Sequence, residues 1–102
     1  MPSKMTTKDF LNDLDNTFKT CLDIAKKKNA DYADTDNPFK NFEMSSIVGI
    51  DPAHAILVRI SEKLARIGGL LDRAAVVEEE KIEDTLIDLI NYCAILKAYL
   101  KK

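Results

Sequence analysis

The stretch that most constrains the fold lies near the C-terminus, at residues 79–100. A helical residue advances about 100° around the axis, so apolar residues spaced by four and three form one continuous stripe. The stripe consists of Ile82, Leu86, Leu89, Cys93, Leu96 and Leu100. Further apolar residues lie on other sides, namely Ile87, Ile90, Ala94 and Ile95. A helix that is apolar on most sides is buried on most sides, so we expect it at the centre of a bundle and in an oligomer interface.

A polar stripe runs along the same helix, on roughly the opposite side. It consists of Asp84, Asp88 and Asn91, at positions i, i+4 and i+7. Two carboxylates one turn apart repel each other and weaken an isolated helix. We therefore expect a basic residue, a metal ion or a ligand to neutralise them.

Two other helices are expected before this one. The first spans about residues 7–29, with Thr6 or Thr7 as a candidate cap. Its apolar face is interpreted as ordinary core and contains Phe10, Leu14, Phe18, Cys21, Leu22 and Ala25. The second helix spans about 52–72, because Asp51 suits the cap position and Pro52 the first helical position. We predict one all-α domain over residues 1–102, with a flexible N-terminus at 1–6 and three main helices that oligomerisation completes.

Residues 30–50, between the first two helices, show no helical period. A loop of this length in a small domain is more often functional than a short connection. It carries Tyr32, Phe39 and Phe42, so we expect it to fold back and pack. These rings either stack on a ligand base or simply attach the loop to the core.

A basic stripe flanks the core face of the second helix. Arg59, Lys63 and Arg66 stand at i, i+4 and i+7, within about 60° of one another. Three cations on one side of a helix suit a phosphate group, although they can also pair with Glu62 and with the acids of the third helix. We expect a groove between the second and third helices in which this stripe takes phosphate. Asp88 and Asn91 would then bind ribose hydroxyls or a base edge.

Composition narrows the possible functions. The net charge is −2, which argues against binding extended nucleic acid, and no apolar run is long enough to span a membrane. The N-terminus lacks the apolar segment of a secretory signal, so we expect a cytoplasmic protein. Cys21 and Cys93 both lie on predicted core faces and are interpreted as buried free thiols. A single histidine and the absence of a Cys-x-x-Cys pair argue against a zinc site.

Four runs together resemble a known family, the phage-associated nucleotide modification associated domain family, type 1. The runs are Lys28–Tyr32, Asn37–Phe42, Arg59–Ile67 and Ile82–Tyr92. They extend over about residues 26–100. The resemblance implies nucleotide metabolism or nucleotide binding in the cytoplasm of phage-infected bacteria. A protein of this kind would hold a nucleotide or a nucleotide-derived signal, and could thereby sequester a host defence messenger.

A more distant resemblance is to the all-α MazG-like nucleoside triphosphate pyrophosphohydrolases. That resemblance implies Mg²⁺ held by acidic pairs on two adjacent helices, for which Glu83, Asp84 and Asp88 would be the ligands here. The second helix departs from that pattern, because it supplies Glu62 and otherwise basic residues. A third possibility is a helical interaction module without a small ligand. We favour the nucleotide binder, with a homo-oligomer as its expected state.

Overall fold

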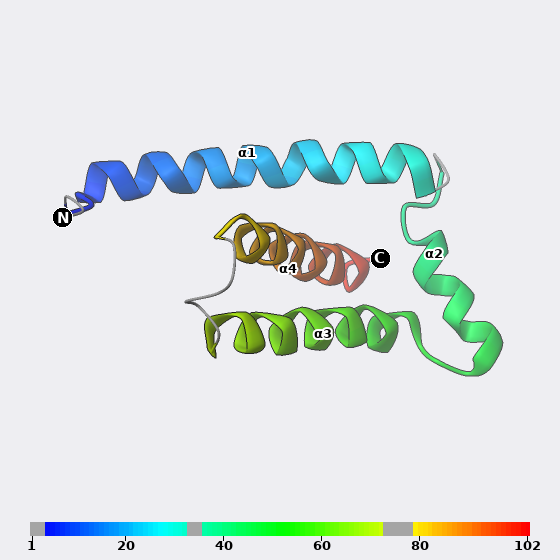
Figure 1. Ribbon diagram of the computed structural model, residues 1–102. Coiled ribbons are helices and arrows are strands. Elements are labelled where there is room, and N and C mark those ends of the chain that lie inside the picture. Colours follow the sequence, from blue (N-terminus) through cyan, green and yellow to red (C-terminus); the bar gives the residue numbers. More distant parts are fainter. Residues whose placement is uncertain (1–3, 33–35, 73–78) are drawn as a thin grey trace.

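The computed structural model describes residues 4–32, 36–72 and 79–102, and in these ranges the regular structure is entirely helical (Figure 1). The elements are α1 (Thr7–Tyr32), α2 (Lys40–Glu43), the 3₁₀-helix η1 (Met44–Val48), α3 (Pro52–Asp72) and α4 (Glu79–Tyr99). The predicted all-α class is confirmed, and α3 has the predicted bounds. Within the described ranges, no helix is both long enough and apolar enough to cross a membrane.

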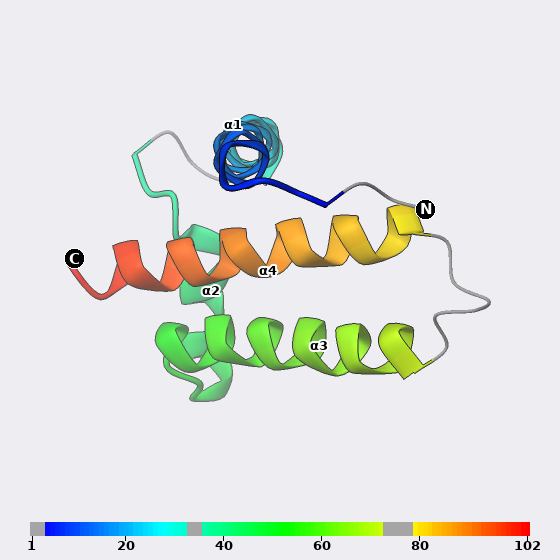
Figure 2. The same ribbon diagram turned by 90° about the vertical axis from the view of Figure 1, so that its left-hand side faces the viewer.

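The helix α4 occupies the middle of the structure, between α1 on one side and α3 on the other (Figures 1 and 2). The pair α3 and α4 runs antiparallel, and this pair has the most extensive packing of the chain. Figure 2 looks nearly along α1 while α3 and α4 run across the picture, so α1 crosses α4 instead of lying alongside it. This central position of α4 agrees with its apolar residues on several sides.

Local sequence explains where α1 begins. The backbone N–H of Asp9 donates to Thr6 Oγ1 at 3.0 Å, and the N–H of Thr6 donates to Asp9 Oδ2 at 3.1 Å. This reciprocal pair is a capping box, with the acidic residue favoured by the helix dipole. The predicted end at Asn29 is wrong, because α1 continues to Tyr32 and Asn29 keeps a helical backbone.

Residues 36–50 are more ordered than the predicted irregular loop. Asn37 Oδ1 accepts a hydrogen bond from the Phe39 N–H at 3.1 Å, which forms a local turn before α2. Gly49 ends η1 with φ of +79°, a left-handed conformation that glycine adopts without strain. Single turns of helix of this kind escape periodicity analysis, because a period needs more than one turn to be visible.

The core that this chain buries alone is small. Among the described residues, Ile56 is fully buried, and Cys21, Leu70 and Thr85 are nearly so. The α1 face predicted as core is largely exposed, with Phe18 and Leu22 each 55% exposed. The prediction for Cys93 is also wrong, because this thiol is exposed whereas Cys21 is buried. The reason is geometric: α1 crosses α4 near Cys21, so most of the α1 face meets no other helix among the described residues.

Substitution of Ile56 by alanine should therefore destabilise the fold strongly. Removing a fully buried Ile side chain costs about 2–5 kcal/mol in free energy of unfolding. The matched control is Val58→Ala, two residues along the same helix at an exposed position, which should change stability by less than about 0.5 kcal/mol. Urea denaturation followed by circular dichroism measures both values. Equal effects of the two substitutions would contradict the packing of α3 on α4 described above.

Candidate functional site

The carboxylate of Asp88 joins three helices at one point. Its Oδ1 lies 3.2 Å from Lys28 Nζ of α1, and its Oδ2 lies 3.2 Å from Lys63 Nζ of α3. The carboxylate and the Lys63 side chain are both about three-quarters shielded from solvent, which strengthens their attraction relative to a fully exposed pair. The polar stripe was expected to need a neutralising partner, and at Asp88 two basic residues fill that role.

The rest of the polar stripe of α4 faces α1, not α3. Asn91 Nδ2 donates to the carbonyl oxygen of Cys21 at 3.1 Å. The Cys21 side chain is buried at the same place, and this burial raises the pKa of its thiol and so favours the protonated form. On α4, Thr85 is buried and lies about 120° around the helix from Asn91, so we infer that it is buried against α3 and not against α1.

The basic stripe of α3 is consequently not gathered opposite the acidic stripe. Lys63 reaches Asp88, but Arg59 Nη1 lies 3.5 Å from Glu62 Oε2 of its own helix, and both of these side chains are exposed. Arg66 is exposed as well. The predicted facing of the two stripes is therefore wrong except at the Lys63–Asp88 pair.

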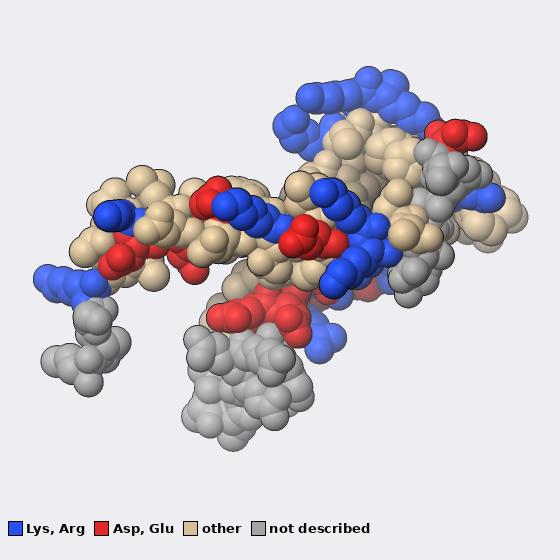
Figure 3. All heavy atoms as spheres, turned by 90° about the horizontal axis from the view of Figure 1, so that it is seen from above, with Lys and Arg blue, Asp and Glu red and all other residues tan. Residues whose placement is uncertain are grey.

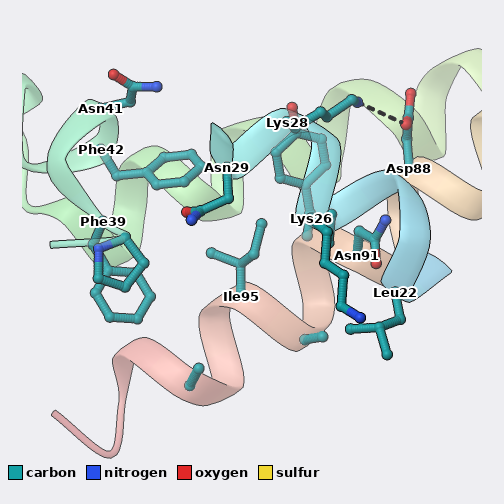
Figure 4. A pocket seen from close by; sticks show the side chains of 15 residues that line it. Leu22, Lys26, Lys28, Asn29, Phe39, Asn41, Phe42, Asp88, Asn91 and Ile95 are labelled. Carbon is teal, nitrogen blue, oxygen red and sulfur yellow. Dashed lines mark hydrogen bonds and ion pairs between the residues drawn. The ribbon is translucent and has the colours of Figure 1, made fainter. Parts of the chain in front are cut away.

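A groove of about 660 Å³ lies between α1, α2 and α4, on the side of α4 away from the α3 contact (Figure 4). This position differs from the predicted groove between the second and third helices, whose apolar faces pack directly on each other. The lining contains Asp88, Asn91, Phe39 and Phe42 from the predicted set, but none of the three basic residues of α3. Its basic residues are Lys26 and Lys28 of α1.

The two ends of the groove differ in chemistry. Phe42, Asn29 and Ile95 point toward one another in the middle of Figure 4, whereas Asn41 points away. Phe39 lies at the apolar end, and Lys26, Leu22 and Asn91 gather at the other. The groove thus offers an aromatic wall, the Asn29 amide near its centre, and the Asn91 amide and a lysine at its other end.

Aromatic contacts fix α2 against α4. The rings of Phe39 and Tyr99 meet edge to face with centroids 5.3 Å apart, and those of Phe42 and Tyr92 do so at 6.4 Å. The expectation that this segment folds back and packs is therefore confirmed. Both Phe rings are half-buried, so each keeps surface toward the groove in addition to its contact with α4.

A polar contact reinforces the same wall at the C-terminus of the chain. Lys102 Nζ pairs with Glu43 Oε2, and Asn37 Nδ2 donates to Glu43 Oε1. These two partners, Lys102 first, hold the pKa of Glu43 below its ordinary value, and Glu43 in turn raises the pKa of Lys102. The groove wall is therefore attached to α4 through both rings and charges.

The remaining predicted site residues lie elsewhere. Glu83 and Asp84 line a second hollow, of about 580 Å³, on the opposite side of the α1–α4 crossing, together with Asp13. Asp88 is not part of it, so the three proposed Mg²⁺ ligands do not converge. Within the described ranges, no group of three or more His, Cys, Asp or Glu side chains could hold a metal ion. The side chain of Tyr32 lies outside the described residues.

Sequence reasoning missed Lys26, Lys28 and Asn29 as groove residues. A run of lysines near the end of a helix is favoured by the helix dipole alone, so it does not by itself indicate a site. The sequence nevertheless contains a signal for these residues. Lys26 and Asn29 follow Leu22 by four and seven residues, so they lie on the same side of the helix and continue its apolar face with polar groups. Tyr92 also lines the groove, and its place there depends on where α2 lies.

Comparison of the chain with protein-family models, with curated proteins and with solved structures finds no match in any of the three. The resemblances given above stay predictions.

Protonation of Glu43 should loosen the α2 wall. Because its pKa is lowered in the folded chain, the stabilisation is present above the ordinary value of about 4.3 and is lost as the pH falls through the lowered value. A carboxyl ¹³C NMR titration should show a Glu43 midpoint below about 4.3, and Lys102→Ala should move it upward. An unchanged midpoint in that variant would contradict the contact with Lys102.

Proposed function

We propose that the protein binds a nucleotide or a nucleotide-derived small molecule in the groove between α1, α2 and α4. The observation that carries the proposal is the pairing, in one groove, of half-buried aromatic rings with a lysine and with amide groups. Planar bases stack on aromatic faces, amides read base edges or ribose hydroxyls, and ammonium groups bind phosphate.

The size of the groove supports a ligand of this class. Pockets for small molecules and cofactors have volumes of about 300–1,000 Å³ and are mostly apolar with a few placed polar groups. A volume of about 660 Å³ falls within that range and accommodates a mononucleotide or a dinucleotide-sized signal. The groove is also formed by elements distant in sequence, which is typical of a binding site positioned by the whole fold.

Each end of the groove has a role in the proposal. The base would lie against Phe42 and Phe39, near the amide of Asn29 (Figure 4). The phosphate would lie at Lys26, whose ammonium group is not engaged by Asp88, whereas Lys28 is. Asn91 donates to the Cys21 carbonyl through its amide nitrogen, so its carbonyl oxygen would accept a hydrogen bond from a ribose hydroxyl.

The test is binding of a panel of nucleoside mono-, di- and triphosphates and cyclic dinucleotides, measured by isothermal titration calorimetry. Lys26→Gln should weaken binding of the best member by about tenfold or more, because a hydrogen bond to a charged group contributes about 1.5–3 kcal/mol. Lys27→Gln is the matched control, since Lys27 is the next residue on α1 but does not line the groove. It should bind as the unmodified chain does.

Two outcomes would contradict the proposal. Absence of heat across the whole panel is one, and an equal loss of affinity in the two lysine variants is the other. Including Mg²⁺ and assaying pyrophosphate separates a binder from a hydrolase, because a binder leaves the triphosphates intact. Mass spectrometry of small molecules released when the purified protein is denatured would identify a ligand that is retained during purification.

A further inference from the structure

The N-terminal half of α1 forms a helical arm, of which Asp13 and Asn16 line the second hollow opposite α4. Residues 7–16 are all exposed, and the arm projects beyond α3 and α4 (Figures 1 and 3). An apolar stripe follows the arm and consists of Phe10, Leu11, Leu14, Phe18 and Leu22. A helical segment of about ten residues is marginal in water without packing, and an apolar stripe makes exposure more unfavourable. The arm therefore needs a surface to cover it.

A second exposed apolar face lies on the α3–α4 pair. On each helix an exposed residue directly follows a buried one: Leu57 follows Ile56, Leu71 follows Leu70, and Leu86 follows Thr85. Each exposed residue is turned by about 100° around its helix from the buried residue before it. Because α3 and α4 run antiparallel, this turn is clockwise on one helix and anticlockwise on the other when both are viewed from the same end. Both steps therefore point to the same side of the pair. This α3–α4 face consists of Leu57, Leu64, Leu71, Leu86, Cys93 and Leu100.

The total surface shows how much more area the chain leaves uncovered than a compact monomer does. The chain exposes 7933 Å², whereas a compact monomer of its mass exposes about 5,800 Å². Its radius of gyration is 16.1 Å, against about 13 Å for a compact domain of its length. The excess is roughly 2,100 Å² per chain. Obligate homodimers bury about 1,000–2,500 Å² on each partner, so the excess matches one such interface.

We propose that a second copy of this chain covers both surfaces, with the arm of each copy lying on the α3–α4 face of the other. Both surfaces belong to the same chain, so a two-fold axis covers all four of them in one closed, isologous interface. Their dimensions agree: residues 7–22 span about 24 Å as a helix, and the 21 residues of α3 span about 31 Å.

The same interface reaches the groove. Leu22 is the last residue of the apolar stripe and also lines the groove beside Lys26. A copy seated along the stripe therefore lies at the groove rim. The interface itself depends on the arm and the α3–α4 face alone, so it stands or falls independently of the proposed ligand.

Sedimentation equilibrium of the full chain tests the proposal. The unmodified protein should be a dimer at micromolar concentration. An arm variant, Phe10→Glu with Leu14→Glu, and a face variant, Leu64→Glu, should each raise the dissociation constant at least a hundredfold. Asn12→Glu is the control for an introduced carboxylate, because it adds one negative charge on the other side of the arm and should leave the dimer intact. Circular dichroism checks that each variant keeps its helix content.

Mixing the two variants distinguishes the proposed interface from other dimers. The arm variant retains an intact face and the face variant retains an intact arm, so an equimolar mixture should recover a heterodimer with one of its two half-interfaces. Cys93 should react faster with a thiol reagent in the arm variant than in the unmodified dimer, with the buried Cys21 unreactive in both. A monomeric unmodified protein, a face variant that stays dimeric, or a mixture that stays monomeric would overturn the proposal.

Discussion

The apolar surface of α4 is too wide for one neighbouring helix to cover, and the arrangement of the chain follows from that constraint. One side of α4 packs on α3 around the buried Thr85, and another is crossed by α1 at the buried Cys21. Asp88 lies where these two contacts meet and pairs with a lysine from each neighbour. The side that carries Leu86 and Cys93 stays exposed in the single chain, and it is the side on which we place the arm of a second copy.

The crossing of α1 over α4 also produces the groove. Helices that run side by side close the space between them, whereas crossed helices meet at one point and diverge on either side. On one side of the crossing the space is walled by α2, held in place by two aromatic pairs and by the Glu43–Lys102 contact. On the other side it is the more acidic hollow lined by Asp13, Glu83 and Asp84. We place the proposed phosphate in the first of these, because the lining of that space includes Lys26 and Lys28.

Local features could be predicted from the sequence, whereas the relations between helices could not. Thr6 and Asp9 form the expected cap, and Pro52 begins α3 as expected, because such signals depend on a few neighbouring residues. A periodic stripe, however, states only that a face is apolar and not what covers it. A pairing of the basic stripe with acids of the third helix was among the possibilities, and Lys63 does pair with Asp88. The contact of Asn91 with α1 was not expected, because it depends on where α1 crosses α4. Phe39 and Phe42 were identified as groove candidates without the lysine and amide of α1, because the α1 crossing angle has no local sequence signal.

The central claim is that a nucleotide occupies the α1–α2–α4 groove and not the basic stripe of α3. Side-chain amide signals of asparagine are resolved in ¹H–¹⁵N correlation spectra, and Asn29 and Asn91 report on the groove directly. On titration with the tightest-binding nucleotide, these two signals and the backbone amides of Lys26 and Phe42 should shift together along one saturation curve. Amides around Arg59 and Arg66 should stay in place. Shifts confined to α3, or no shifts at any of these positions, would contradict the account.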